Sequence, residues 1–221
     1  MTAPTSVRLK ITAYSDYVCP WCYIGLHRVE ELQRAYPVDV EWRPFELHPE
    51  TPKSGAHWLG RLGSERRIAA YTNNILMLAH DSDIPMAMPE IIANSHLALE
   101  ASEFAREHGG FDALHHALFS AYFDHGRNIG EIDVVCDVAR ACGVDDQRLR
   151  QALVDETYAA RVDASTEAAR NDEILSAPTF VFTGGFRLTG AQDYAVFENV
   201  TKRLLARIAS GALAPGDIEP D

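Results

Sequence analysis

The chain has 221 residues, a length that suits one large domain or one small domain that carries an insertion. Apolar residues make up 47% of it, which is enough for a sizeable core without disulfide bonds. The formal net charge of −12 gives a surface that repels phosphate groups. We therefore expect neither a nucleic acid nor a membrane as a partner.

The first six residues lack the apolar segment and positive flank of a secretory signal peptide. No apolar run approaches the ~20 residues that span a bilayer. We therefore expect a cytoplasmic protein, in a reducing compartment. Four cysteines in such a compartment are more often reactive, metal-binding or buried than joined in structural disulfides.

The start of the chain predicts a βαβ unit. Residues 7–13 alternate apolar and polar side chains, which indicates a strand with one buried face. Apolar residues at steps of three and four from Cys22 to Tyr36 predict a helix that begins at Pro20 and ends before Pro37. Alternation returns in residues 38–43 as a second strand, which completes the unit.

The middle of the chain has helical spacing, and strands return only near the end. Helices are expected over 64–79, 95–108, 111–123, 131–142 and, in two pieces, 146–173. Residues 179–182 and 186–188 flank Gly184-Gly185 as a hairpin, and apolar residues from Phe197 to Ile208 predict a closing helix.

These elements favour an α/β domain interrupted by a helical insertion, because neither end alone has enough strands for a sheet. We expect the α/β domain to comprise residues 1–50 and 176–211 and the helical insertion to comprise 51–175. Residues 212–221 are expected to form a frayed tail.

The cysteine pair of Cys19-Pro20-Trp21-Cys22 has two common uses, metal binding and redox chemistry. A structural zinc site needs four ligands, and Cys136 and Cys142 do not supply the spacing of a second pair. We therefore expect no metal site. Cys136 and Cys142 lie close to an apolar helical stripe, which favours core packing over chemistry.

The redox interpretation has a mechanism. Cys19 falls at the N-cap of the predicted helix, where unpaired N–H groups and the positive end of the helix dipole stabilise a thiolate. Cys22 lies on the apolar stripe and points inward. We expect Cys19 to be the exposed nucleophile that forms a mixed disulfide, and Cys22 to resolve it.

The sequence resembles the DsbA-like thiol–disulfide oxidoreductases of the FrnE type, in the thioredoxin superfamily. The resemblance covers about residues 8–210. The matching segments are Asp16 to Gly25, Trp42 to Pro49, Asn94-Ser95, Ala121 to Phe123, Ala177 to Val181 and Thr189 to Gln192. It implies a thioredoxin fold with a helical insertion, catalysis by Cys19 and Cys22 with no cofactor beyond a redox-active disulfide, and thiols or disulfides as substrates.

The resemblance also implies that Pro178 is a cis-proline that faces the cysteine pair and exposes the Ala177 backbone to an extended substrate. Two positions depart from the family pattern. Ser176-Ala177 stands where Gly-Val is usual before this proline. His48 stands where asparagine is expected, and it is either a loop histidine without a role or a residue of the site. In the family, residues beside this proline influence the redox poise and the release of substrate, so the change at Ser176-Ala177 bears on both properties.

Three further residues are candidates for supporting roles. Asp16 is expected either to relay protons to the thiols or to cap the turn by accepting backbone N–H bonds. Pro20 starts the helix, and Trp21 is expected to shape the contact surface over the disulfide.

The alternative function is that of a glutathione-dependent isomerase or transferase of the kappa type, such as 2-hydroxychromene-2-carboxylate isomerase. That group has a serine at the position of Cys19 and lacks the second cysteine, so the cysteine pair argues against it. Glutathione is a candidate co-substrate in both interpretations. A non-enzymatic binding module is the third interpretation. The sequence does not predict the oligomeric state.

Overall fold

The computed structural model describes residues 8–214. Val7, the first residue of the expected strand, and residues 215–221 of the expected tail lie outside this range. Among the described helices, none combines the length and the apolarity that crossing a bilayer requires.

Contacts divide the chain into two compact units. The sheet unit comprises Met1–Ser15, Trp21–Arg43 and Ile174–Asp221, and the helical unit comprises Asp16–Pro20 and Pro44–Glu173. The expected division placed the helical insertion at residues 51–175, whereas this helical unit begins at Pro44 and also includes Asp16–Pro20, the turn that leads into the first helix. The reason is that Asp16 accepts a hydrogen bond from the Leu47 N–H and that Tyr17 packs on Phe119, both within the helical unit.

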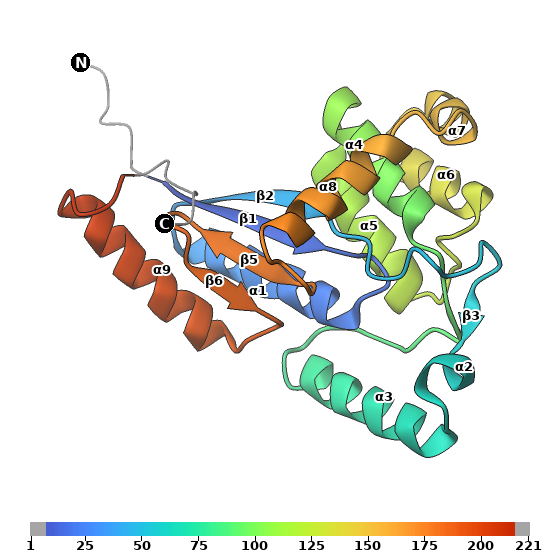
Figure 1. Ribbon diagram of the computed structural model, residues 1–221, viewed down its shortest axis with the longest axis horizontal. Coiled ribbons are helices and arrows are strands. Elements are labelled where there is room, and N and C mark those ends of the chain that lie inside the picture. Colours follow the sequence, from blue (N-terminus) through green and yellow to red (C-terminus); the bar gives the residue numbers. More distant parts are fainter. Residues whose placement is uncertain (1–7, 215–221) are drawn as a thin grey trace. The chain divides into compact units, whose positions relative to one another are not determined.

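The sheet unit contains a four-stranded sheet in the order β2-β1-β5-β6 (Figure 1). Its strands are β1 (Leu9–Ser15), β2 (Val38–Pro44), β5 (Thr179–Phe182) and β6 (Arg187–Thr189). β1 pairs with β5 in antiparallel register, with Ile11 opposite Phe182. β5 and β6 form the expected hairpin, in which Gly184 and Gly185 have φ values of 81° and 74° that favour glycine.

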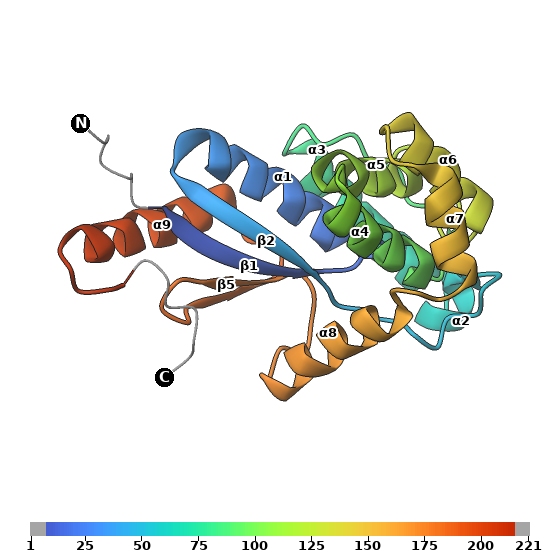
Figure 2. The ribbon, with the colours of Figure 1, turned by 90° about the horizontal axis from the view of Figure 1, so that it is seen from above.

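Helices α1 (Pro20–Ala35) and α9 (Tyr194–Ala209) cover one face of this sheet (Figure 2). Their common contact is Phe180 on β5, which is fully buried. Its ring lies 4.9 Å from the ring of Phe197 on α9 and 6.3 Å from that of Trp42 on β2. A Cβ atom added to Gly25 on α1 would lie 2.9 Å from the Phe180 Cζ, so a side chain there has no room.

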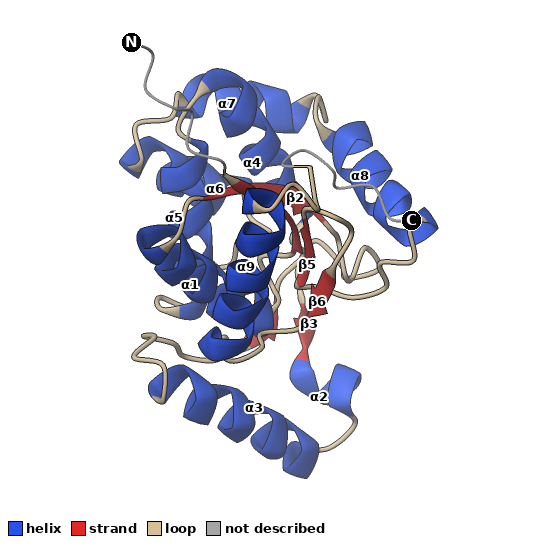
Figure 3. Ribbon diagram, turned by 90° about the vertical axis from the view of Figure 1, so that its left-hand side faces the viewer, coloured by secondary structure: helices blue, strands red, loops and turns tan. Residues whose placement is uncertain are grey.

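Within its described residues the helical unit contains seven helices. They are α2 (Trp58–Leu62), α3 (Glu65–His80), α4 (His96–His108), α5 (Phe111–Phe123), α6 (Ile132–Ala141), α7 (Asp146–Val154) and α8 (Ala159–Asn171). Six of them, α3 to α8, correspond to the five expected segments, because the last segment was expected in two pieces. The segment expected in two pieces is α7 and α8. Helix α2 and the short strands β3 (Ala56–His57) and β4 (Ile91–Ile92) were not expected (Figure 3).

The observed architecture confirms the predicted fold class, an α/β sheet domain whose chain is interrupted by helices. The N-terminal strand–helix–strand segment and the C-terminal hairpin with its helix both belong to the sheet unit. The fold therefore places the cysteine pair where β1 leads into α1.

Candidate active site

The cysteine pair lies at the N-terminal end of α1. Cys19 directly precedes Pro20, the first residue of the helix, and Cys22 is in the first turn. The Cys19 N–H donates a hydrogen bond to the Asp16 carbonyl oxygen at 3.1 Å, which closes the turn between β1 and α1. The first turn of α1 carries no acidic residue, so no side chain there offsets the positive end of the helix dipole.

Both cysteines are buried, which corrects the expectation that Cys19 is exposed. Cys19 keeps 5% of its surface and Cys22 keeps none. Tyr17 and Val18, the two residues before Cys19, are buried as well. The order of the two exposures is the expected one, with Cys22 the more deeply buried.

Pro178 and Phe180, in the segment that leads into β5, pack on α1 at Gly25. The peptide bond between Ala177 and Pro178 is cis, the isomer that the family resemblance implies. A Cβ atom at Gly25 would lie 3.5 Å from the Pro178 Cγ. Because Gly25 is the sixth residue of α1, Pro178 borders the second turn of this helix.

Pro20 and Trp21, the residues between the cysteines, differ in exposure. Pro20 is buried and Trp21 is half-buried. Trp21 therefore retains surface that a bound molecule can contact, whereas Pro20 serves the helix start.

Asp16 is the buried acid of this region. Its Oδ1 accepts from the Val18 N–H at 3.2 Å, and its Oδ2 accepts from the Leu47 N–H at 2.7 Å. Burial raises the pKa of Asp16 from 3.8 to about 6, against the opposing effect of the Leu47 hydrogen bond. The carboxylate therefore does cap the turn, and its raised pKa also makes it able to exchange a proton near neutral pH.

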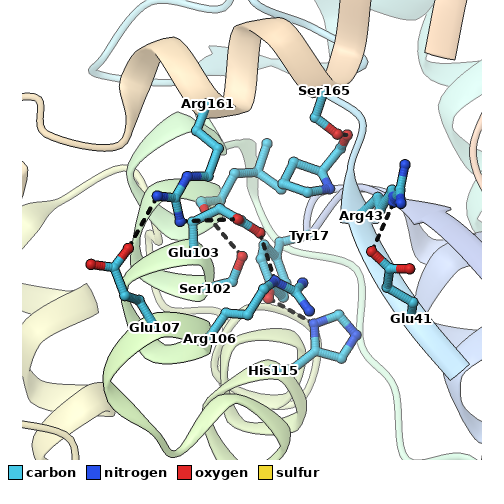
Figure 4. Close-up of polar contacts among 12 residues, drawn as sticks. Tyr17, Glu41, Arg43, Ser102, Glu103, Arg106, Glu107, His115, Arg161 and Ser165 are labelled. Carbon is cyan, nitrogen blue, oxygen red and sulfur yellow. Dashed lines mark hydrogen bonds and ion pairs between the residues drawn. The ribbon is translucent and has the colours of Figure 1, made fainter. Parts of the chain in front are cut away.

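A buried pair next to this turn, Tyr17 and His115, was not expected from the sequence. The Tyr17 hydroxyl and the His115 Nδ1 are 2.7 Å apart in a hydrogen bond (Figure 4). Burial raises the pKa of Tyr17 and lowers the pKa of His115 to about 3, so both side chains are neutral near pH 7. The sequence places His115 next to His116 in the expected helix 111–123, and only His115 is buried in α5. This position does not identify Tyr17 as the hydrogen-bond partner of His115.

Ion pairs on the neighbouring helices are more exposed. Arg161 on α8 reaches Glu107 at 3.0 Å and Glu103 at 3.8 Å, and Arg106 reaches Glu103 at 3.1 Å (Figure 4). These contacts tie α8 to α4 within the helical unit.

His48, the departure from the family pattern, lies on the surface of the helical unit. Its Nε2 is 2.8 Å from a guanidinium nitrogen of Arg61, and its Nδ1 is 3.6 Å from Glu50. Burial, followed by the Arg61 charge, lowers the pKa of His48. These surface partners account for its position in the loop.

The residues able to hold a metal ion within the helical unit are Glu46, His96 and Asp163, which carry ligand atoms within 4.8 Å of one another. No cysteine belongs to such a group among residues 8–214. Cys136 is buried in α6, and Cys142, at the end of that helix, donates from its Sγ to the Ala113 carbonyl oxygen at 3.6 Å. Burial raises the pKa of both of these thiols.

Comparisons with known proteins agree with this geometry. The chain is 31% identical over 193 residues to an uncharacterized protein, YwbO, of Bacillus subtilis, an alignment that covers 86% of this chain and 94% of that protein. Its fold is similar to that of a probable DsbA oxidoreductase from Streptomyces coelicolor, with a TM-score of 0.81, 26% identity and 90% coverage of both chains.

A 2-hydroxychromene-2-carboxylate isomerase shares the fold as well. The TM-score is 0.76 over 93% of this chain and 100% of the isomerase, and the identity is 18%. At this identity the similarity establishes the fold alone.

The family model of the DSBA-like thioredoxin domain matches residues 10–202, a range that contains the helical unit, most of the sheet unit and the cysteine pair. The chain therefore belongs to the DSBA-like thioredoxin domain family.

Proposed function

We propose that this protein is a thiol–disulfide oxidoreductase in which Cys19 is the nucleophile and Cys22 the resolving thiol. The observation that carries the proposal is the position of Cys19-Pro20-Trp21-Cys22 at the N-terminal end of α1, with no acidic residue in the first turn. The partial positive charge of that end favours the thiolate of the residue that precedes the helix. Cys22, inside the first turn and fully buried, is the less accessible of the two.

The reaction is a pair of thiol–disulfide exchanges. The Cys19 thiolate attacks one sulfur of a substrate disulfide, a mixed disulfide forms, and the other substrate sulfur leaves as a thiolate. The Cys22 thiolate then attacks the Cys19 sulfur and releases the second substrate thiolate. The substrate gains two electrons and two protons, and the protein gains the Cys19–Cys22 disulfide. The reverse sequence oxidises a substrate dithiol.

We assign to Asp16 the acceptance of the proton that the resolving thiol loses. A pKa of about 6 lets a carboxylate hold or release a proton within the pH range in which thiol exchange operates. The same carboxylate fixes the turn through its bonds to Val18 and Leu47, so its substitution affects both functions.

Substrates are proposed to be protein or small-molecule thiols and disulfides, with glutathione as a candidate co-substrate. Half-buried Trp21 supplies contact surface next to the pair. The backbone of Ala177, on the segment that packs against α1, is proposed to pair with an extended substrate by strand addition.

The test is reduction of insulin disulfides in the presence of dithiothreitol, followed as turbidity. We expect Cys19→Ser to abolish the activity and Cys22→Ser to accumulate mixed disulfides that appear on non-reducing gels. Cys142→Ser is the matched control, since it removes a thiol that is not part of the Cys19–Cys22 pair, and it should retain wild-type activity. Full activity in Cys19→Ser would refute the proposal.

The isomerase alternative is tested in parallel by glutathione-dependent isomerisation of 2-hydroxychromene-2-carboxylate. The shared fold keeps this alternative open. Turnover of that substrate by Cys22→Ser, together with no insulin reduction by the wild type, would favour it. The predicted cytoplasmic location is tested separately by fractionation of cells that express the native gene.

A further inference from the structure

Three side chains from separate segments of the helical unit converge at one end of α4. Glu46 follows strand β2, His96 is the first residue of α4, and Asp163 is on α8. Each offers one ligand atom, and these atoms all lie within 4.8 Å of one another. The side chain of Glu46 is 4% exposed, that of His96 is 27% exposed, and Asp163 is exposed. The cluster therefore runs from the interior to the solvent, which gives an ion a path into it.

The backbone holds Glu46 against the face of α8 that carries Asp163. The Glu46 N–H donates to the Thr166 Oγ1 at 3.0 Å, and the Glu46 carbonyl oxygen accepts from Arg170 at 3.3 Å. Asp163, Thr166 and Arg170 are three, four and seven residues apart and share one helix face. Because Arg170 donates to the carbonyl oxygen, this hydrogen bond does not neutralise the Glu46 carboxylate.

Negative charge exceeds positive charge among these side chains. The Glu46 Oε2 is 3.0 Å from the His96 Nδ1, and the Glu100 Oε1 is 3.7 Å from the His96 Nε2. Three carboxylates, those of Glu46, Glu100 and Asp163, thus surround a single imidazole. Even a protonated imidazole leaves an excess of negative charge, two of whose carriers are buried.

Glu100 supplies an independent observation. The residue is 1% exposed, and its Oε2 is buried with no hydrogen-bond partner within the described part of the chain. Hydrogen bonds from the backbone of Tyr158 and Ala159, at the start of α8, hold the carboxyl group in place. A buried carboxylate oxygen without a partner is costly. Glu100 lies on the Nε2 side of His96, opposite the Nδ1 that faces Glu46, where the outer carboxylate of a metal-bound histidine stands.

We propose that Glu46, His96 and Asp163, with Glu100 behind His96, form a binding site for a divalent transition-metal cation. One imidazole nitrogen with several carboxylate oxygens is the ligand set of Mn²⁺, Fe²⁺ or Zn²⁺, whereas Ca²⁺ takes oxygen ligands alone. The metal takes the place of the proton that joins His96 to Glu46. This site departs from the expectation that the protein has no metal site, and it does not depend on the cysteine pair.

The test uses Mn²⁺ as the probe, because carboxylates bind it and thiols bind it weakly. The full chain, kept reduced with a phosphine, is titrated with MnCl₂, and free Mn²⁺ is measured by electron paramagnetic resonance. We expect one Mn²⁺ per chain. Glu46→Gln and His96→Gln should each weaken binding by at least tenfold, roughly the range seen when groups around a metal are removed.

The matched control is Glu103→Gln, which removes another buried carboxylate from α4 and should bind Mn²⁺ like the wild type. Circular dichroism verifies that each variant folds. If Glu46→Gln does not fold, Asp163→Asn replaces it in the test, because Asp163 is an exposed ligand whose substitution leaves the core intact. Weaker Mn²⁺ binding by Asp163→Asn would then support the proposal. No binding by the wild type, or equal binding by the wild type and the folded ligand variants, would overturn the proposal.

Discussion

The buried carboxyl group of Asp16 makes the stability of the protein depend on pH in a defined way. Its pKa is about 6 in the folded chain against an ordinary value of 3.8. The folded state therefore binds the proton more tightly than the unfolded state. The resulting destabilisation is absent below about pH 3.8, grows as the pH rises to about 6, and is constant above that. A difference of about 2 pKa units corresponds to about 3 kcal/mol.

Replacement of Asp16 by asparagine removes this charge and keeps the shape of the side chain. The asparagine oxygen can accept from the Leu47 N–H or from the Val18 N–H, but not from both, and the lost bond costs about 1–2 kcal/mol. We therefore expect Asp16→Asn to be more stable than the wild type by about 1–2 kcal/mol above neutral pH. Near pH 4 the variant should be equal or less stable.

The assay is guanidinium unfolding of both reduced proteins at fixed ionic strength across this pH range, with identical slopes required for the comparison. Asp112→Asn, a change at an exposed carboxylate in the first turn of α5, is the control and should show a difference that varies little with pH. A stability difference for Asp16→Asn that does not change between about pH 4 and pH 8 would refute the reasoning.

Three further outcomes are expected. Gly25→Ala, which in an open helix would stabilise, should destabilise by about 1 kcal/mol in thermal unfolding, because the new methyl group meets the buried Phe180 ring. A raised melting temperature would show that this ring moves freely. Tyr17→Phe should cost about 1–3 kcal/mol in the same assay, because His115 loses its hydroxyl partner. An unchanged melting temperature would show that the hydrogen bond between Tyr17 and His115 does not stabilise the folded protein. Iodoacetamide in short pulses should label Cys19 before the other thiols, as read by peptide mass spectrometry, and earlier labelling of any other cysteine would contradict the proposed nucleophile.

Elements with a strong local pattern were predictable from the sequence. The helix from Pro20 and the hairpin around Gly184-Gly185 follow from periodicity and turn residues, and both are observed. Strands β3 and β4 have two residues each and exist because Ala56 pairs with Ile92, so no local pattern indicates them. Short pairings of this kind depend on tertiary contacts that a sequence reading does not contain.

The candidate site was predictable only in part, for the same reason. The position of Cys19 at a helix start is local, and the sequence predicted it. Its burial depends on the surroundings of residues 16–18, which belong to the helical unit. Glu100 has the sequence appearance of a solvent-facing helix charge, yet it is buried beside His96. Both the burial of Cys19 and the grouping of Glu46, His96 and Asp163 depend on segments that are distant in the chain. Neither could therefore be predicted from a local sequence pattern.

The contact between Gly25 and Phe180 has a consequence for how relatives of this protein can diverge. The two positions are far apart in the chain but share one small volume, so a larger residue at one requires a smaller residue at the other. An alanine at position 25 should accompany leucine or valine at position 180 in related sequences. Paired substitution of this kind would reveal the packing of the first helix on the late strand to a reader who had only an alignment.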